Sequence, residues 1–236
     1  PAAAAEPISL QGKRGHPRRR VMSQIDHLVI GAAALDTAVD WARERFGVAP
    51  AARGRHPLMS THNALWHLAV PGQPDAYLEI VAIDPDAPNP GRPRWFGLDR
   101  PETQAMLVEA PRLLTWQIRP SAGLDAAIGT AGVPTGPALA VTRDALSWRL
   151  TVPEDGTMPF GGRFPVMIEW DPGVPTPPET LPPAGLSLES LTLAGDPALS
   201  AALARVGAED LVGLGPPEAP PIEAVLTTPA GRVTLR

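Results

Sequence analysis

Apolar and polar positions follow the periods of short strands and helices from residue 22 onward. Residues 25–31 are rich in β-branched and aliphatic side chains, which predicts a strand. In residues 35–46 apolar side chains recur at helical spacing and a glycine follows, which predicts a helix. Residues 61–70 and 77–83 predict two more strands around a Pro-Gly turn. The first part of the chain is therefore expected to fold as a strand, a helix and further strands.

The same order of elements begins again twice. A Pro-rich connector at residues 84–93 ends the first unit, residues 22–93, and a linking helix is expected at 95–109. The second unit, residues 112–170, is expected to contain a strand at 113–119, a helix at 124–130 and strands at 138–142, 146–152 and 165–170. After a Pro-rich linker at 171–183, the third unit, residues 184–236, is expected to contain a strand at 186–194, a helix at 197–206 and strands at 210–214, 222–228 and 232–235. Three units in the order βαβββ predict an α+β fold.

The first two units also share a spacing that suggests an internal duplication. If His27 is placed against Trp116, the predicted helix begins eight residues later in both units. Glu79 and Glu169 then lie 52 and 53 residues after those two positions, each near the end of an aliphatic run. A matched offset over this length predicts that the four residues occupy equivalent places in two related units.

The two glutamates are unusual for their strands. Alternation puts Glu79 on one face with Tyr77 and Val81, and it puts Glu169 on one face with Met167. A charged carboxylate among aliphatic side chains is costly if it is buried without a partner. Each glutamate is therefore expected to face water, a cation or a metal ion, or else to point outward from a half-solvated sheet.

Composition narrows the classes of function. The 236 residues include no cysteine, which excludes disulfides, thiolate metal sites and thiol nucleophiles, so any metal must be held by histidine and carboxylate. A net charge of −5 predicts no general attraction to nucleic acid or to acidic membranes, and no apolar run is long enough to span a bilayer. Residues 1–21 are basic and lack apolar periodicity, so they are expected to form a disordered extension, and a cytoplasmic location is expected. Nucleophile-elbow, zinc-protease and dinucleotide-binding motifs are absent from the sequence.

Several stretches together resemble the vicinal oxygen chelate superfamily, and most closely its glyoxalase-like branch. The stretches are IDHLVIGAAALDTAVDWARERFGV from residue 25, RHPLMSTHNAL from residue 55, YLEIVAIDPDAP from residue 77, RPRWFGLD from residue 92, LLTWQIR from residue 113 and FPVMIEW from residue 164. The resemblance covers about residues 25–170, and the third unit matches more weakly. It implies that two βαβββ modules pair into a cupped mixed sheet that encloses one divalent metal ion.

The resemblance also implies where the metal ligands come from, namely the first and last strands of each module. The matching positions are His27, Glu79, Trp116 and Glu169. An indole cannot be a ligand, so Trp116 departs from the four-ligand pattern and is expected to contact substrate instead. His27, Glu79 and Glu169 would suit Zn²⁺, Mn²⁺, Ni²⁺ or Fe²⁺ and leave positions open for substrate oxygens.

Other polar residues are candidates for the same site. His62 would supply a replacement ligand or a general base if its face of the strand looks into the cup. His56 lies in a loop that is expected to line the mouth, and Asn63 is a candidate for substrate binding. Arg94 is expected to bind a substrate carboxylate through its planar guanidinium. Each of these residues also has a plain structural interpretation, as a hydrogen-bonded or surface side chain.

The sequence thus supports two hypotheses. In the first, the protein is a metal-dependent lyase or isomerase of the glyoxalase type, in which the metal acts as a Lewis acid on a small oxygen-chelating substrate and Glu169, Glu79 or His62 moves a proton. In the second, the same cup binds a small molecule without metal. The expected partner is a small-molecule substrate, not nucleic acid or membrane, and a homodimer is possible. The third unit, with Ser190 at the His27 position, is expected to be structural and to bury a face against the paired modules or another subunit.

Overall fold

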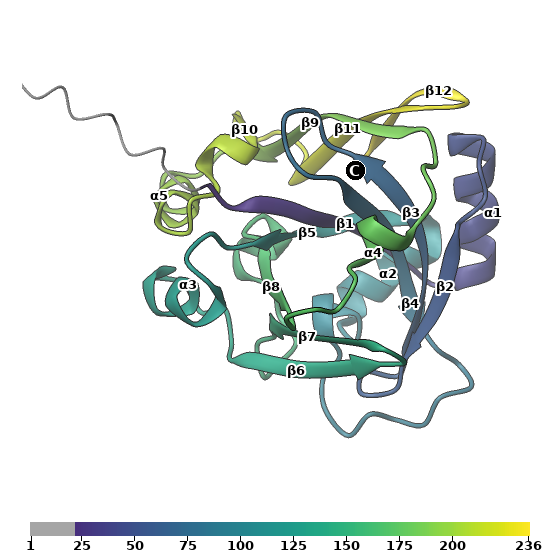
Figure 1. The fold of residues 1–236 in the computed structure, drawn as a ribbon, viewed down its shortest axis with the longest axis horizontal. Helices are drawn as coiled ribbons and strands as arrows, with labels where there is room; N and C mark the ends of the chain where they lie inside the picture. The colour runs from purple at the N-terminus through teal and green to yellow at the C-terminus, as the bar shows by residue number, and fades with distance from the viewer. Residues whose placement is uncertain (1–21) are drawn as a thin grey trace, which may run out of the picture.

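The computed structural model describes residues 22–236, so the predicted extension at 1–21 lies outside the described residues. The strands form one mixed sheet in the order β12-β11-β9-β3-β4-β1-β5-β8-β7-β6, with β2 paired to β3 and β10 paired to β9. The helices lie outside this sheet and pack against it, α1 on β3 and β4 and α2 on β1 (Figure 1). The predicted α+β class with a mixed sheet is confirmed. None of the helices in residues 22–236 is long and apolar enough to cross a membrane.

The first module contains β1 (Gln24–Ala32), α1 (Leu35–Phe46), β2 (Ala52–His56), β3 (Thr61–Ala69) and β4 (Ala76–Ile83). All but β2 were located from the sequence, and β2 places His56 at the end of a strand instead of in the expected loop. β1 pairs with β4 in parallel, and β4, β3 and β2 continue in antiparallel order. The apolar stripe of α1 is buried, and the helix ends at Gly47, whose φ of 72° is one that glycine adopts without strain.

The second module repeats this pairing. The connecting segment holds a short 3₁₀ turn (Trp95–Gly97) and α2 (Pro101–Glu109) in place of the single helix expected at 95–109. The module itself contains β5 (Arg112–Arg119), α3 (Leu124–Thr130), β6 (Ala138–Arg143), β7 (Leu146–Thr151), a 3₁₀ turn (Pro159–Gly162) and β8 (Val166–Trp170). β5 pairs with β8 in parallel, and β8, β7 and β6 are antiparallel. β1 and β5 pair in antiparallel fashion and join the two modules.

The third unit has the predicted order of elements but a different pairing. After α4 (Pro177–Thr180) it contains β9 (Leu186–Ala194), α5 (Pro197–Arg205), a 3₁₀ turn (Glu209–Leu211), β10 (Gly213–Gly215), β11 (Ile222–Thr228) and β12 (Gly231–Leu235). In each of the first two modules the first strand pairs with the last strand. In the third unit the first strand, β9, lies instead between β11 and β3 and does not pair with β12. The third unit therefore extends the sheet of the first module at β3.

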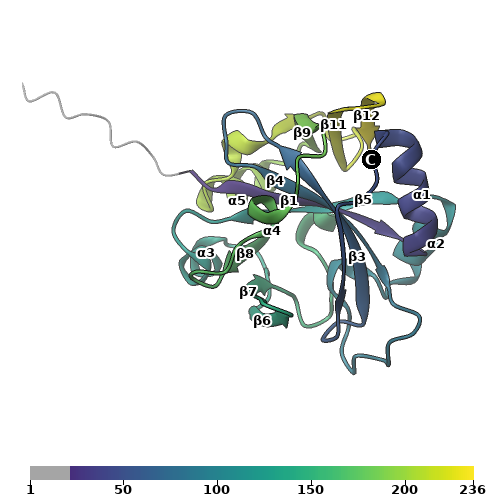
Figure 2. The same ribbon diagram turned by 45° about the vertical axis from the view of Figure 1, so that its right-hand side comes forward.

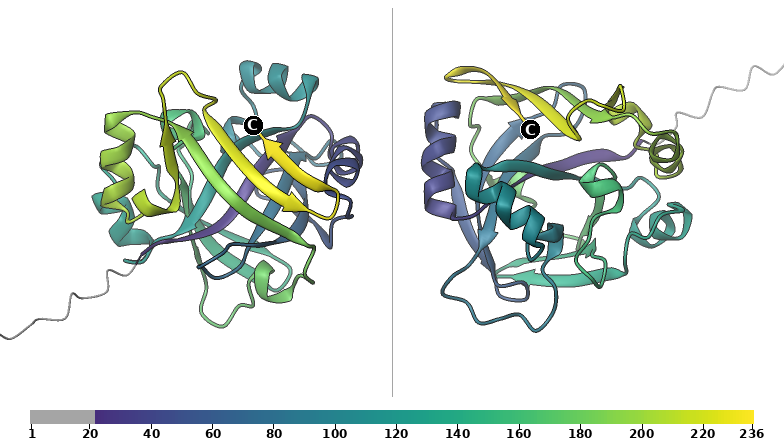
Figure 3. Two further views of the ribbon diagram at one scale, coloured as in Figure 1. Left: turned by 90° about the horizontal axis from the view of Figure 1, so that it is seen from above. Right: turned by 180° about the vertical axis from the view of Figure 1, so that it is seen from behind.

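The third unit covers the outer face of the paired modules. Seen from above, β11 and β12 cross over β1 (Figure 3), and β12 lies next to α1 (Figure 2). The main core lies between these layers and unites residues of all three units, among them Leu28, Trp66, Trp116, Leu191 and Leu193. The expectation that the third unit buries a face against the paired modules is confirmed. The opposite face of the module sheet holds a second, smaller apolar cluster and, beside it, a group of polar side chains.

Removal of residues 171–236 is expected to destabilise the protein severely, because it exposes the apolar outer face of β1, β3 and β5. The fragment 22–170 should aggregate on size-exclusion chromatography or unfold at a much lower temperature than the chain 22–236. A soluble fragment with the melting temperature of the longer chain would contradict the structural role of the third unit.

Candidate functional site

The inner face of the module sheet carries a compact set of polar and aromatic side chains. They surround a small cavity, called the cup, which is lined by His27, His56, Asn63, Leu65, Tyr77, Glu79, Trp95, Phe96, Gln117, Arg143, Trp148, Leu150, Ile168, Trp170 and Pro177. Both modules contribute, and α4 approaches through Pro177. The free space is about 30 Å³, room for roughly one or two water molecules.

His27 is the buried centre of the cup, and two carboxylates hold it. Its Nδ1 lies 2.6 Å from Oδ1 of Asp26, and its Nε2 lies 3.6 Å from Oε2 of Glu79. A shift of the β1–β5 register at Asp26 lets neighbouring residues of one strand contact each other through their side chains. The ring also stacks on Tyr77, with centroids 4.1 Å apart. Burial by itself would lower the pKa of His27, but the hydrogen bonds and charges of Asp26 and Glu79 outweigh it and raise the pKa.

Asp26 is in turn held from the second module. The Nε of Arg119 lies 3.2 Å from its Oδ2, and the indole Nε1 of Trp170 donates a hydrogen bond of 3.0 Å to the same oxygen. The carboxylate is fully buried, so these partners supply the compensation that burial of a charge requires. As a result, the position of the His27 ring is fixed from both modules.

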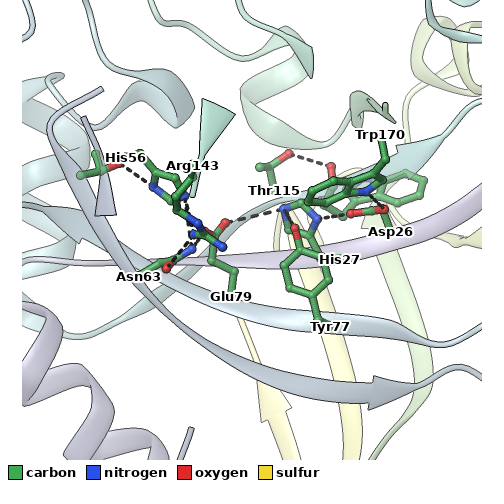
Figure 4. A network of polar contacts seen from close by, with 11 residues as sticks. Asp26, His27, His56, Asn63, Tyr77, Glu79, Thr115, Arg143 and Trp170 are labelled. Atoms are coloured by element: carbon green, nitrogen blue, oxygen red, sulfur yellow. Dashed lines mark hydrogen bonds and ion pairs between the residues drawn. The ribbon is translucent and has the colours of Figure 1, made fainter. Parts of the chain in front are cut away.

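Glu79 is the second buried charge of the cup. Its Oε1 accepts a hydrogen bond of 2.6 Å from the amide nitrogen of Asn63. Burial would raise the pKa of Glu79, but the hydrogen bond and charge of His27, helped by His56 and Asn63, lower it to about 2. The carboxylate is therefore ionised throughout the physiological range. Figure 4 shows it between His27 and the group formed by Asn63, His56 and Arg143.

The third polar group of the cup is centred on His56. Nη1 of Arg143 donates to its Nε2 at 3.1 Å, which leaves its Nδ1 to donate to the hydroxyl of Thr61 at 3.1 Å. Nη1 of Arg143 also donates to Oδ1 of Asn63 at 3.3 Å. Burial, with the nearby charge of Arg143, lowers the pKa of His56 to about 4 although Glu79 opposes the change. His56 is therefore neutral at pH 7 and acts as an acceptor for Arg143.

The second module presents Gln117 to the cup where Trp116 was expected. Gln117 pairs directly with His27 across β1 and β5, and its buried Oε1 has no hydrogen-bond partner within residues 22–236. Trp116 pairs with Leu28 on the other face, in the main core, and its Nε1 donates to the carbonyl of Arg163 at 2.9 Å. A shift of one residue moves a side chain to the other face of a strand, so the expected contact of Trp116 with substrate is wrong.

Glu169 does not join His27 and Glu79. In β4, Glu79 lies two residues beyond Tyr77, the partner of His27, and in β8 the residue two beyond Val166, the partner of Gln117, is Ile168. Glu169 therefore faces away from the cup.

Its partners are outside the cup as well. Its Oε2 pairs with Arg149, and its Oε1 accepts a hydrogen bond of 3.2 Å from the backbone of Leu124 at the start of α3. No group of three histidines, aspartates or glutamates in residues 22–236 is close enough to hold a metal ion. The expected ligand set of His27, Glu79 and Glu169 is therefore wrong in its third member, because Glu169 lies outside the cup.

Two other expected residues also lie elsewhere. His62 shares the outer face of β3 with Ala64 and Trp66, half-buried, so it is not placed to act as a base or ligand in the cup. Arg94 begins the 3₁₀ turn before α2 and pairs with Asp99 at 2.6 Å instead of lining the cup. Of the expected residues, the structure therefore brings together His27, Glu79, His56 and Asn63.

Some residues of the cup were not predicted from the sequence. They are Tyr77, Gln117, Arg143 and the three tryptophans that line the cup, Trp95, Trp148 and Trp170. Alternation already placed Tyr77 on the face of Glu79, so it could have been included with it. Gln117 differs from the expected Trp116 by one position. No pattern in the sequence around Arg143 indicates a functional role, because that role depends on β6 lying close to the side chains of β2 and β3.

Comparison with known proteins agrees with this architecture. A model of a family described as "Glyoxalase-like domain" matches residues 25–208, which confirms the resemblance carried by the sequence. No curated protein matches the chain. A hypothetical protein from Staphylococcus aureus is 11% identical with a TM-score of 0.51, over 90% of this chain and 84% of that chain. This likeness shows a shared fold.

Two matched structures are of methylmalonyl-CoA epimerase. One is from Mycobacterium tuberculosis, with 19% identity and a TM-score of 0.40 over 65% of this chain and 90% of that chain. The other is in complex with methylmalonyl-CoA and NH₄⁺, with 18% identity and a TM-score of 0.42 over 66% of this chain and 99% of that chain.

The low pKa of His56 predicts a pH-dependent loss of stability. Unfolding returns His56 to an ordinary pKa near 6.5, so the unfolded chain binds an extra proton between about pH 6.5 and pH 4. The contribution of this group to stability is full above pH 6.5 and is lost as the pH falls through about 4, by up to about 3 kcal/mol. Denaturant unfolding of wild type and His56→Gln between pH 4 and 8 measures it. Wild type should lose stability more steeply than His56→Gln below pH 6.5, and parallel curves would contradict the assignment.

Proposed function

The chain belongs to the glyoxalase-like domain family, and we propose that it is an enzyme that binds a small oxygen-chelating substrate in the cup together with a divalent metal ion. The observation that carries this proposal is the orphaned Oε1 of Gln117, buried beside the His27–Glu79 pair. A buried acceptor without a partner is uncommon in folded proteins, and a cation is one group that satisfies it.

Three donor atoms of the cup suit such an ion. They are Nε2 of His27, Oε2 of Glu79 and Oε1 of Gln117, where Gln117 takes the role first expected of Glu169. One imidazole nitrogen with two oxygens fits Zn²⁺, Mn²⁺, Ni²⁺ or Fe²⁺, and three protein ligands leave positions for substrate oxygens. Asp26 supports this set because its contact with Nδ1 directs Nε2 of His27 toward the cup, as carboxylates commonly do behind metal-binding histidines.

The protein's own groups then divide the work. A bound divalent ion would polarise substrate oxygens and so acidify a neighbouring C–H group. Glu79 is the carboxylate of the cup and is the group placed to take the proton from such a C–H group. Burial and the charges of Asp26 and Glu79 raise the pKa of Tyr77 well above its usual value, so its hydroxyl stays protonated and can donate a hydrogen bond to a substrate oxygen. The surrounding indoles of Trp95, Trp148 and Trp170 exclude water from the reacting atoms.

One observation favours the alternative, a small-molecule-binding protein that uses no metal. The second module offers an amide and the aliphatic Ile168 where the first offers His27 and Glu79. In this alternative the orphaned oxygen of Gln117 accepts a hydrogen bond from the ligand itself. Titration with metal ions separates the two functions.

We expect chelator-treated wild type to bind one equivalent of at least one of Zn²⁺, Mn²⁺, Ni²⁺ and Fe²⁺ in calorimetric titrations. His27→Ala, Glu79→Gln and Gln117→Leu should each weaken binding by at least roughly 10- to 100-fold, the loss that even outer partners of a metal site produce. Glu169→Gln is the matched control, because it removes a carboxylate charge outside the cup and should leave the affinity unchanged.

Two results would contradict the proposal. Wild type that binds none of the four ions at micromolar concentrations would favour the metal-free alternative. Loss of binding in Glu169→Gln, with binding retained in Gln117→Leu, would mean that the site lies on the outer face of β8.

A further inference from the structure

Arg143 brings a positive charge into the cup from the far module. It lies at the end of β6, and its Nη1 reaches His56 and Asn63 of the first module at 3.1 and 3.3 Å. Its guanidinium carbon lies 6.0 Å from the ring centroid of Trp148. Within residues 22–236 it forms no ion pair with a carboxylate, unlike Arg119 in the same region, which pairs with Asp26.

The groups that hold Arg143 do not cancel its charge. Asn63 is uncharged, and His56 is neutral because burial and its cationic neighbours lower its pKa to about 4. The carboxylates of Asp26 and Glu79 are already engaged by Arg119, His27 and Asn63. The guanidinium is thus positioned by neutral acceptors and keeps hydrogen-bond donors for an anion.

Gly54 of β2 makes this position possible. A Cβ at residue 54 would lie 2.5 Å from Nη1 of Arg143 and 3.1 Å from Oδ1 of Asn63. The φ of Gly54 is not in the left-handed region, so its backbone does not require glycine. Close approach of the guanidinium is therefore the constraint that excludes a side chain here, and alanine would displace the end of Arg143 while the strand remains acceptable.

We propose that Arg143 binds a carboxylate of the substrate and that Gly54 positions it to do so, so that the substrate class is a small organic acid with an oxygen next to the carboxylate. The requirement for the neighbouring oxygen rests on the proposed function, whereas recognition of the negative charge rests on Arg143 alone. The small volume of the cup favours an acid of few atoms.

Glycolate and its neutral amide, glycolamide, test the proposal, because both present adjacent oxygens and only glycolate carries a charge. Their dissociation constants are measured at pH 7 by calorimetry, with and without the metal ion that wild type binds. Wild type should prefer glycolate by roughly tenfold or more, as expected for a hydrogen-bonded ion pair. In Arg143→Gln and Gly54→Ala the preference should fall to about twofold or less.

Arg53→Gln is the matched control, since Arg53 neighbours Gly54 but is exposed and pairs with Asp36. It should keep the preference of wild type, and the melting temperature of Gly54→Ala should stay within a few degrees of that of Arg53→Gln. The inference is overturned if wild type binds glycolate no better than glycolamide, or not at all up to millimolar concentrations, or if Arg143→Gln keeps the preference. Metal binding is measured in a separate titration. If wild type binds no metal ion but still prefers glycolate to glycolamide, the proposed function is overturned and the inference on Arg143 stands.

Discussion

The buried contact between His27 and two carboxylates is the interaction on which the cup depends. A cation in an apolar interior is stable only beside negative groups, and Asp26 and Glu79 supply them from β1 and β4. Each carboxylate then needs a partner of its own. Arg119 and Trp170 hold Asp26, and Asn63 holds Glu79, so the group of one cation and two carboxylates organises polar side chains from both modules.

Apolar burial elsewhere in the fold offsets the cost of these buried polar groups. The outer face of the module sheet is sealed by the third unit and by α1, and the main core on that side contains large apolar side chains such as Trp66 and Trp116. The inner face holds a second, smaller apolar cluster, which includes Val29, Val81 and Trp148, so the polar side chains of the cup lie beside an apolar core of their own. The pairing of β1 with β5 places Gln117 directly against His27, where the two modules meet.

Most of the fold could be predicted from the sequence, because apolar periodicity reports elements and their order. The first half of the site was also predictable, since His27 and Glu79 lie in strands whose alternation is regular. The second half was not, because the strand-to-helix spacing of the second module is one residue shorter from Gln117 than the spacing from His27. When two strands are aligned one residue out of phase, every side chain is assigned to the wrong face. For this reason Trp116 and Glu169 were predicted to lie in the cup in place of Gln117 and Ile168.

Features that depend on pairing between distant strands were equally hidden. The placement of Arg143 beside His56 requires β6 to approach β2, and the contact of Glu169 with Arg149 requires the β7–β8 register. The third unit shows the same limit, because its order of elements was predicted while the pairing of β9 with β11 and β3 was not.

The protonation of His27 tests the central claim most directly. Nitrogen NMR of the imidazole at pH 6 should show both ring nitrogens protonated in the metal-free protein, because Asp26 and Glu79 raise the pKa of His27. Saturation with zinc should remove the proton from Nε2 and leave Nδ1 protonated against Asp26. A neutral ring in the metal-free protein would contradict the account, and so would a ring that stays unchanged when calorimetry shows zinc to be bound.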